Sequence, residues 1–174
     1  MPKTPLIQYA SLAELFQFYC ENFVVKSPIV SWCGCRIHCA EHHFVHVVKL
    51  FGPEKQPIIF NDERPKIVAQ VDGFGTYEHE QRRAQRLLRF LKAIKQPEIV
   101  VRPDHLKTAD RAFIRHVDCS QYPFMAVLAH KEESGDLSLC TAEPLRGRNL
   151  RRWLTGLVLW SEDKLKAKNT TATR

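Results

Sequence analysis

The side chains best able to move a proton or bind a metal near neutral pH are concentrated between Cys33 and His46. This stretch reads Cys-Gly-Cys-Arg-Ile-His-Cys-Ala-Glu-His-His-Phe-Val-His, and it holds three of the six cysteines and four of the eight histidines. Imidazole titrates near neutral pH, and thiolates are good ligands for zinc. We therefore expect any chemistry of this chain to involve this stretch, either as a metal site or as a site of acid–base catalysis.

The metal interpretation rests on the spacing of the ligands. Zinc sites commonly contain a Cys-x2–4-Cys pair followed by a second pair further along the chain. Here the alternative ligand set is Cys35, Cys39, His42 and His46, in which the two histidines would share one face of a helix. No second cysteine pair at zinc-finger spacing and no His-Glu-x-x-His sequence accompanies them. The competing interpretation is that the cysteines are small buried side chains.

The acid–base interpretation places histidines on a helix. Residues 40–50 carry apolar side chains at helical spacing, and the Gly-Pro pair after Phe51 predicts the end of this helix. His43 and His46 would then lie three residues apart, where either one can serve as a general acid or base. The alternative is that they are ordinary, partly exposed helix residues.

Helical patterns precede strand patterns along the chain. The helical segments are 11–23, where Ser11 and Glu14 have the form of a capping box, 40–50 and 78–95. Short strands are predicted at 36–39 and 66–71, and alternating apolar patterns with short links predict four more strands at 98–102, 111–117, 124–131 and 137–142. We expect an α+β fold, with N-terminal helices packed on an antiparallel sheet of about four strands.

The chain length of 174 residues suits one main domain. We expect an N-terminal lead and helix over 1–27, the main domain over 28–161 and a disordered basic tail over 162–174. No run of eighteen apolar residues predicts a membrane span, and the first residues lack an apolar signal core. A cytoplasmic chain with reduced cysteines and no membrane partner is therefore expected.

Two groups of arginines provide candidate contacts to nucleic acid. The net charge is +7 and the pI is about 9.2, which favours polyanionic partners. One group lies on the predicted helix 78–95, and the other follows the last predicted strand. The candidate RNA-binding residues are Arg82, Arg86, Arg89, Arg146, Arg148, Arg151 and Arg152. The alternative for the first group is an ordinary solvated helix face.

Three segments resemble those of a known nuclease superfamily. The first is the strand-to-helix segment 37–47, which ends in a histidine followed by an apolar residue. The second is the segment 87–100, a helix that runs into a proline and a short strand, and the third is the hairpin region 113–144, with its Thr-Ala pair. Over residues 36–146 the layout resembles phage-associated nucleases of the barnase–EndoU–colicin E5/D–RelE (BECR) superfamily. The chain departs from that pattern in its additional histidines and cysteines and in the Glu-Pro pair that follows Thr-Ala.

The resemblance implies a BECR-like fold and a metal-independent endoribonuclease that cleaves RNA or tRNA without a cofactor, often as a toxin with an antitoxin or immunity partner. His46 matches the helix histidine, Arg115 the basic strand residue and Thr141 the small hydroxyl. His43 or Lys131 would be the second proton carrier. Three hypotheses result: a ribonuclease, a non-catalytic nucleic-acid-binding domain, and a zinc-stabilised domain.

Overall fold

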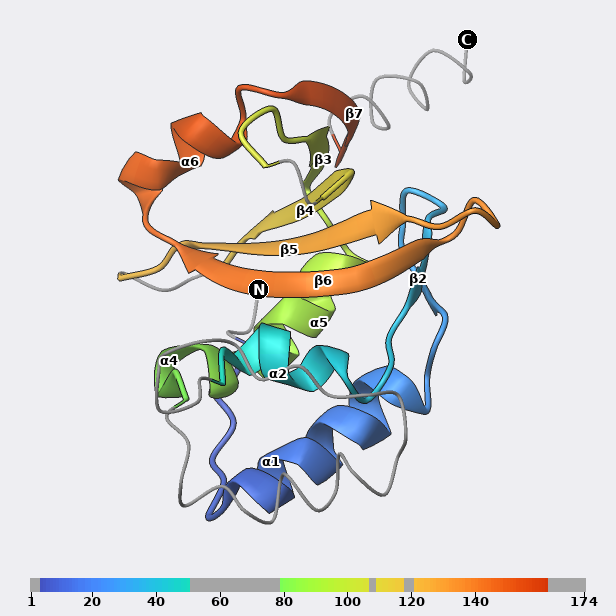
Figure 1. Cartoon of the computed structure of the whole chain (residues 1–174). Coiled ribbons are helices and arrows are strands. Elements are labelled where there is room, and N and C mark those ends of the chain that lie inside the picture. The colour runs from blue at the N-terminus through green and yellow to red at the C-terminus, as the bar shows by residue number, and fades with distance from the viewer. Residues whose placement is uncertain (1–3, 51–78, 107–108, 118–120, 163–174) are drawn as a thin grey trace, which may run out of the picture.

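The computed structural model describes residues 4–50, 79–106, 109–117 and 121–162. Its helical elements are α1 (Leu12–Tyr19), the π-helical turn η1 (Cys20–Val24), α2 (His43–Val48), α4 (Gln81–Ala84), α5 (Leu87–Lys95) and α6 (Gly147–Trp153). Its strands are β1 (Ile29–Val30), β2 (Arg36–His38), β3 (Ile99–Arg102), β4 (Arg111–His116), β5 (Phe124–Lys131), β6 (Leu137–Leu145) and β7 (Leu157–Ser161). The α+β class is confirmed (Figure 1).

The sheet is larger than predicted and is mixed rather than wholly antiparallel. The order of its seven strands is β1-β2-β6-β5-β4-β3-β7. The four predicted strands correspond to β3, β4, β5 and β6, and their pairings with one another are antiparallel. However, β2 pairs with β6 in parallel, through Ile37 opposite Leu137 and His38 opposite Ser138. The expectation of about four antiparallel strands was therefore incomplete at both edges, where β1–β2 and β7 extend the sheet.

The helices differ from their predicted extents for local reasons. At α1 the predicted N-cap is confirmed, because Ser11 Oγ accepts a hydrogen bond of 3.1 Å from the Glu14 backbone N–H. Helix α2 begins at His43, three residues later than predicted, and it ends at Val48 because Lys49 takes a left-handed conformation, with φ of 52°. The predicted helix 78–95 is divided into α4 and α5. The predicted strand 66–71 and nearly all of the predicted tail lie outside the described residues.

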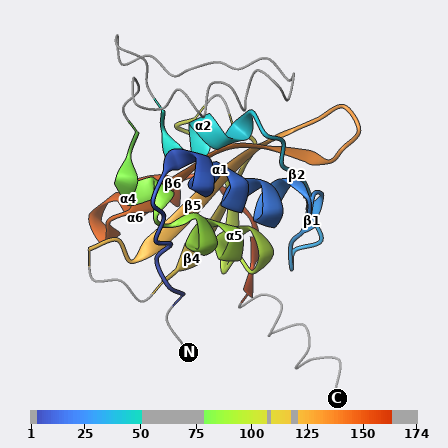
Figure 2. The same ribbon diagram turned by 90° about the horizontal axis from the view of Figure 1, so that it is seen from below.

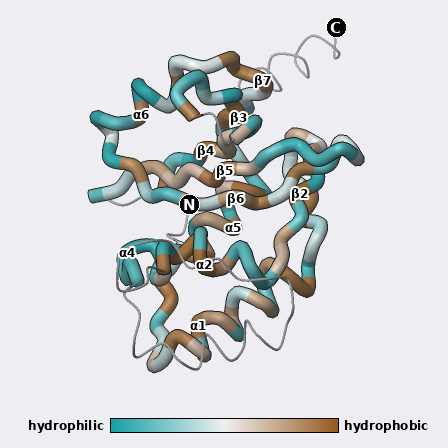
Figure 3. Tube along the Cα trace, in the orientation of Figure 1, coloured by the Kyte–Doolittle hydropathy of each residue, from teal (hydrophilic) through white to brown (hydrophobic). Residues whose placement is uncertain are grey.

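The described helices cover the sheet unequally. One core joins α1, α2 and α5 to one face of the sheet (Figure 2). Within this core the Phe16 and Phe44 rings have centroids 5.1 Å apart. A smaller core lies on the other face, where Trp153 of α6 packs with Ile114 and Leu128. Helices α4 and α6 are mostly hydrophilic, in contrast to the apolar strands (Figure 3). In the segments that the structure describes, no helix is both long enough and apolar enough to cross a bilayer.

Candidate nucleic-acid interface

Helix α2 lies against β6 and brings together two of the predicted catalytic residues. Thr141 Oγ1 on β6 donates a 2.8 Å hydrogen bond to the backbone carbonyl of His46 on α2. The contact therefore fixes the position of the helix, whereas the His46 imidazole itself remains half-buried. Burial, followed by the nearby charge of His42, lowers the pKa of His46. At pH 7 this histidine is neutral, which is the form that a general base requires.

His43 lies deeper in the same contact. Its Nδ1 accepts a 3.0 Å hydrogen bond from the Ala40 backbone N–H, and its Nε2 lies 3.4 Å from Ser138 Oγ on β6. Because Nδ1 is an acceptor, the ring proton resides on Nε2 and points at the serine. Burial lowers the pKa of His43 to about 3, with smaller contributions from neighbouring histidines. His43 is thus a neutral, packed residue near pH 7.

The other two predicted catalytic residues lie elsewhere. Arg115 is only 6% exposed, and its guanidinium donates a hydrogen bond to the backbone carbonyl of Gln96, just beyond α5. Lys131 lies at the end of β5, opposite Leu137, beside the turn to β6. In the described part of the chain, no recorded contact joins either residue to His46. The five predicted catalytic residues therefore do not form a single constellation.

Three of the predicted RNA-binding arginines converge on one ring. The guanidinium carbons of Arg82, Arg86 and Arg146 lie 4.9, 5.3 and 5.5 Å from the centroid of the Tyr122 ring. Arg82 also donates a 2.8 Å hydrogen bond to the Tyr122 hydroxyl, and Arg146 Nη2 lies 3.5 Å from the same oxygen. These bonds lower the pKa of Tyr122, which reflects a positive local field.

The exposed arginines of α6 continue from this cluster. Arg146 is the N-cap of α6, and the side chains of Arg148, Arg151 and Arg152 are exposed on that helix. Figure 1 shows α4 and α6 at the same end of the sheet, where β5 begins and β6 ends. We call these six residues the arginine face; Arg82, Arg146, Arg148, Arg151 and Arg152 reach solvent, and Arg86 is buried beside Tyr122.

Not every arginine of the predicted helix 78–95 faces solvent. Arg86 is 7% exposed and Arg89 is 8% exposed, and the Arg89 guanidinium donates to the backbone carbonyl of Thr4. Arg83 is buried between Glu80 and the carbonyl of Ala142. The interpretation of these side chains as a solvated helix face is therefore wrong for Arg83, Arg86 and Arg89. Arg89 also lies outside the arginine face, and only Arg82 of this group is substantially accessible.

The alternative metal ligands are not assembled in the described residues. Cys39 is buried, and burial raises the pKa of its thiol to about 12. His42 contacts His43 edge-on, with centroids 4.1 Å apart. Among the described side chains, no group of three or more His, Cys, Asp or Glu residues is arranged to hold a metal ion. The set Cys35, Cys39, His42 and His46 therefore does not form a site in this structure.

Sequence reasoning missed two residues that organise these contacts. The Tyr122 ring contacts three arginines from distant segments, and Ser138 lies against His43. A lone tyrosine outside any predicted strand or helix carries no pattern of its own, so only tertiary structure reveals its role. Ser138 lies in the predicted strand 137–142, but its position on that strand gave no indication of its contact with His43.

The comparisons with known proteins identify no relatives. No family model, curated protein or solved structure matches this chain. Function is therefore argued from the geometry and charge of the site itself.

Proposed function

We propose that this chain binds nucleic acid, with RNA as the expected partner, through the arginine face. The observation that carries the proposal is the convergence of three guanidinium groups within 5.5 Å of the Tyr122 ring. Like charges held this close repel one another, and a polyanion relieves that repulsion. Guanidinium groups also match the bidentate geometry of phosphate oxygens.

The acidic groups near the arginine face leave its exposed part positive. Glu80 forms ion pairs with Arg82 and Arg83, and Glu143 lies 3.5 Å from Arg83. These ion pairs offset the positive charge mainly on the α4 side of the arginine face. The arginines of α6 are exposed to solvent and carry no ion pair recorded in the described residues. We therefore assign phosphate contact chiefly to Arg148, Arg151 and Arg152, and a supporting role to the cluster around Tyr122.

The test is the salt dependence of binding to a labelled RNA, measured by fluorescence anisotropy. Each lost phosphate contact reduces the slope of log affinity against log salt by about 0.7 for single strands or about 0.9 for a duplex. Replacing Arg148, Arg151 and Arg152 together by glutamine should therefore reduce the slope by about 2 for single-stranded RNA. A matched DNA of the same sequence shows whether RNA is preferred.

The control removes the same charge from positions outside the arginine face. Lys26 follows η1, and Lys92 and Lys95 lie on α5. Replacing these three lysines by glutamine should leave the salt slope close to that of the wild type. Equal slopes for the two triple variants, or no binding at low salt, would remove the arginine face from the proposal.

A BECR-like ribonuclease is the second candidate, and a specific observation favours it. His46 is half-buried and neutral at pH 7, and its helix is bonded to Thr141 of β6. A positioned general base contributes roughly 10²–10⁴-fold in rate. If the chain cleaves the same labelled RNA, His46→Ala should therefore lose that factor, whereas substitution of the exposed His116 should not. If the wild-type protein does not cleave the RNA, the ribonuclease candidate is rejected and only the binding function remains.

A further inference from the structure

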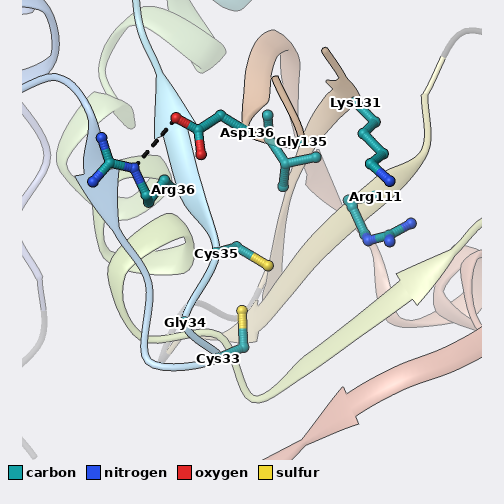
Figure 4. Close-up of a pocket in the computed structure, with 9 residues that line it drawn as sticks. Cys33, Gly34, Cys35, Arg36, Arg111, Lys131, Gly135 and Asp136 are labelled. Carbon is teal, nitrogen blue, oxygen red and sulfur yellow. Dashed lines mark hydrogen bonds and ion pairs between the residues drawn. The ribbon is translucent and has the colours of Figure 1, made fainter. Parts of the chain in front are cut away.

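The loop between β1 and β2 presents two thiols side by side. Cys33, Gly34 and Cys35 form a tight turn, in which Gly34 N–H donates to the Ser31 carbonyl and Ser31 N–H donates to the Cys35 carbonyl, each at 2.9 Å. Gly34 has φ of +82°, a conformation that a side chain would strain. Figure 4 shows the two sulfur atoms turned toward each other across this turn. Both cysteines are free thiols and only partly buried.

Both cysteines line a hollow of about 270 Å³, which also has cationic side chains in its walls. Arg111 of β4 and Lys131 of β5 line it together with Arg36 and Asp136 (Figure 4). Asp136 is engaged on the other side of the hollow, where it pairs with Arg36 at 3.2 Å and His38 at 2.8 Å. Of the three cationic side chains that line the hollow, Arg36 is paired with Asp136, whereas Arg111 and Lys131 have no ion-pair partner among the described residues.

The two thiols are chemically distinct. A hydrogen bond from Cys35 lowers the pKa of the Cys33 thiol to about 6, and Ser31 Oγ, 3.4 Å away, adds to this effect. The same contact with Cys33 raises the pKa of Cys35, because ionising both thiols would place two negative charges together. One thiolate and one thiol are therefore present near pH 7, which are the attacking and resolving partners of thiol–disulfide exchange.

We propose that Cys33 and Cys35 form a dithiol site that reduces small disulfides bearing carboxylates, such as oxidised glutathione. The Cys33 thiolate attacks one sulfur of the disulfide, so that a mixed disulfide forms on Cys33 and the first thiolate product leaves and takes a proton from water. Cys35 then loses its proton to water and attacks Cys33 Sγ, which releases the second product thiolate. The protein gives up two electrons and closes the Cys33–Cys35 disulfide; the small disulfide gains them as two thiols.

The cationic walls define the class of substrate. Arg111 and Lys131 can bind the carboxylates of an anionic disulfide beside Cys33, which raises the local substrate concentration. Cys140 lacks this setting, since burial raises the pKa of its thiol to about 11. The site is independent of the arginine face, because neither cysteine contributes to that surface.

The first experiment traps the intermediate in the reduced full-length protein. After oxidised glutathione is added, intact mass and peptide mapping should show a Cys33–Cys35 disulfide in the wild type and two released glutathiones per protein. Cys35→Ser should retain one glutathione on Cys33, and Cys33→Ser should form no such adduct on Cys35. Cys140→Ser, the matched control, should behave as the wild type does. An adduct distributed equally over Cys33 and Cys140 would overturn the proposal.

The second experiment tests the substrate class by charge. Rates are measured with oxidised glutathione and with neutral hydroxyethyl disulfide for the wild type and an Arg111→Gln/Lys131→Gln variant. Electrostatic focusing typically raises encounter rates about tenfold or more. The rate with oxidised glutathione, divided by the rate with hydroxyethyl disulfide, should therefore fall by about tenfold in the variant. An unchanged ratio would show that Arg111 and Lys131 do not bind the carboxylates of the substrate.

A third experiment follows the alkylation of Cys33 by iodoacetamide as the pH is raised. The rate should rise with a midpoint near pH 6. A midpoint near that of an ordinary thiol would contradict the assignment of Cys33 as the attacking group.

Discussion

At the scale of single residues, burial decides which histidines of the Cys33–His46 stretch can change charge. His43 is 6% exposed and has polar contacts at both ring nitrogens, to Ala40 and Ser138. Protonating this ring in the folded protein would place a charge under α2 and would give Nδ1 a proton that clashes with the Ala40 N–H. The folded state therefore resists protonation down to a pH of about 3.

This resistance predicts acid sensitivity. The unfolded chain protonates His43 near its ordinary pKa of about 6.5, whereas the folded chain does so only at about 3, so stability is lost as the pH falls through that window. The loss is at most about 1.4 kcal/mol per pH unit. In urea unfolding between about pH 4 and about pH 7, His43→Asn should show a shallower decline of the unfolding free energy than the wild type, because Asn keeps an acceptor for Ala40 but does not titrate.

The comparison with a second histidine variant isolates this effect. His116 is exposed on β4, so His116→Asn should keep the wild-type dependence on pH. Parallel curves for the wild type and His43→Asn would show that His43 has an ordinary pKa in the folded state.

At this scale the sequence was partly informative. The stretch in which the sequence concentrates cysteines and histidines contains side chains with shifted pKa values, among them His43, His46 and Cys33. The sequence did not distinguish a buried structural histidine from an accessible one, because that depends on β6, about 95 residues further along the chain. The arginines were visible in the sequence, but their convergence on Tyr122 was not.

At the scale of elements, the connection from α6 to β7 depends on one glycine. A Cβ atom built on Gly156 would lie 1.8 Å from the Arg102 carbonyl oxygen and 2.7 Å from its carbon. Both are backbone atoms of β3, the strand that pairs with β7 through Arg102 opposite Leu157. No side-chain movement can relieve this contact, so the chain must shift to accept any other residue.

Gly156→Ala should therefore destabilise the protein. Overpacking of this kind costs roughly 1–3 kcal/mol, and here it would separate β7 from β3. The measurement is the free energy of unfolding in urea. Gly147→Ala is the matched control, because a Cβ atom there meets nothing within 4 Å and alanine favours a helix. Equal stability of the two variants would show that the β3–β7 edge accommodates a side chain without cost.

The length and regularity of the apolar pattern explain which strands and helices could be predicted from the sequence. Strands β3–β6 are four to nine residues long and carry enough alternation to be recognised. Strand β2 (Arg36–His38) corresponds to the predicted short strand 36–39, but its parallel pairing with β6 is set by tertiary contacts. Strand β1 has two residues, which are too few for a period. The break between α4 and α5 is similarly local: Arg86 leaves the helical conformation, with φ of −104° and ψ of 12°, although its neighbours keep helical spacing.

At the scale of the whole molecule, the β5–β6 hairpin separates the two proposed sites. The arginine face lies where β5 begins at Phe124 and β6 ends at Leu145, which are paired. The dithiol hollow lies at the other end, where Lys131 is paired with Leu137. Seven residue steps along β5 at about 3.3 Å each separate the two ends by roughly 23 Å. This exceeds the Debye length of about 8 Å at physiological salt.

The two sites should therefore act independently. Oxidising Cys33 and Cys35 removes one thiolate charge at a distance at which salt screens it, and effects at sites more than about 10 Å apart with no shared partners usually add. The affinity for labelled RNA should be the same, within about twofold, for the reduced protein, the protein oxidised with glutathione disulfide and the Cys33→Ser/Cys35→Ser variant. The Arg148→Gln/Arg151→Gln/Arg152→Gln variant should likewise form the Cys33–Cys35 disulfide at the wild-type rate. If oxidation instead weakens RNA binding while the double-serine variant does not respond, the hairpin transmits a structural change between its ends, and the two sites belong to one regulated function.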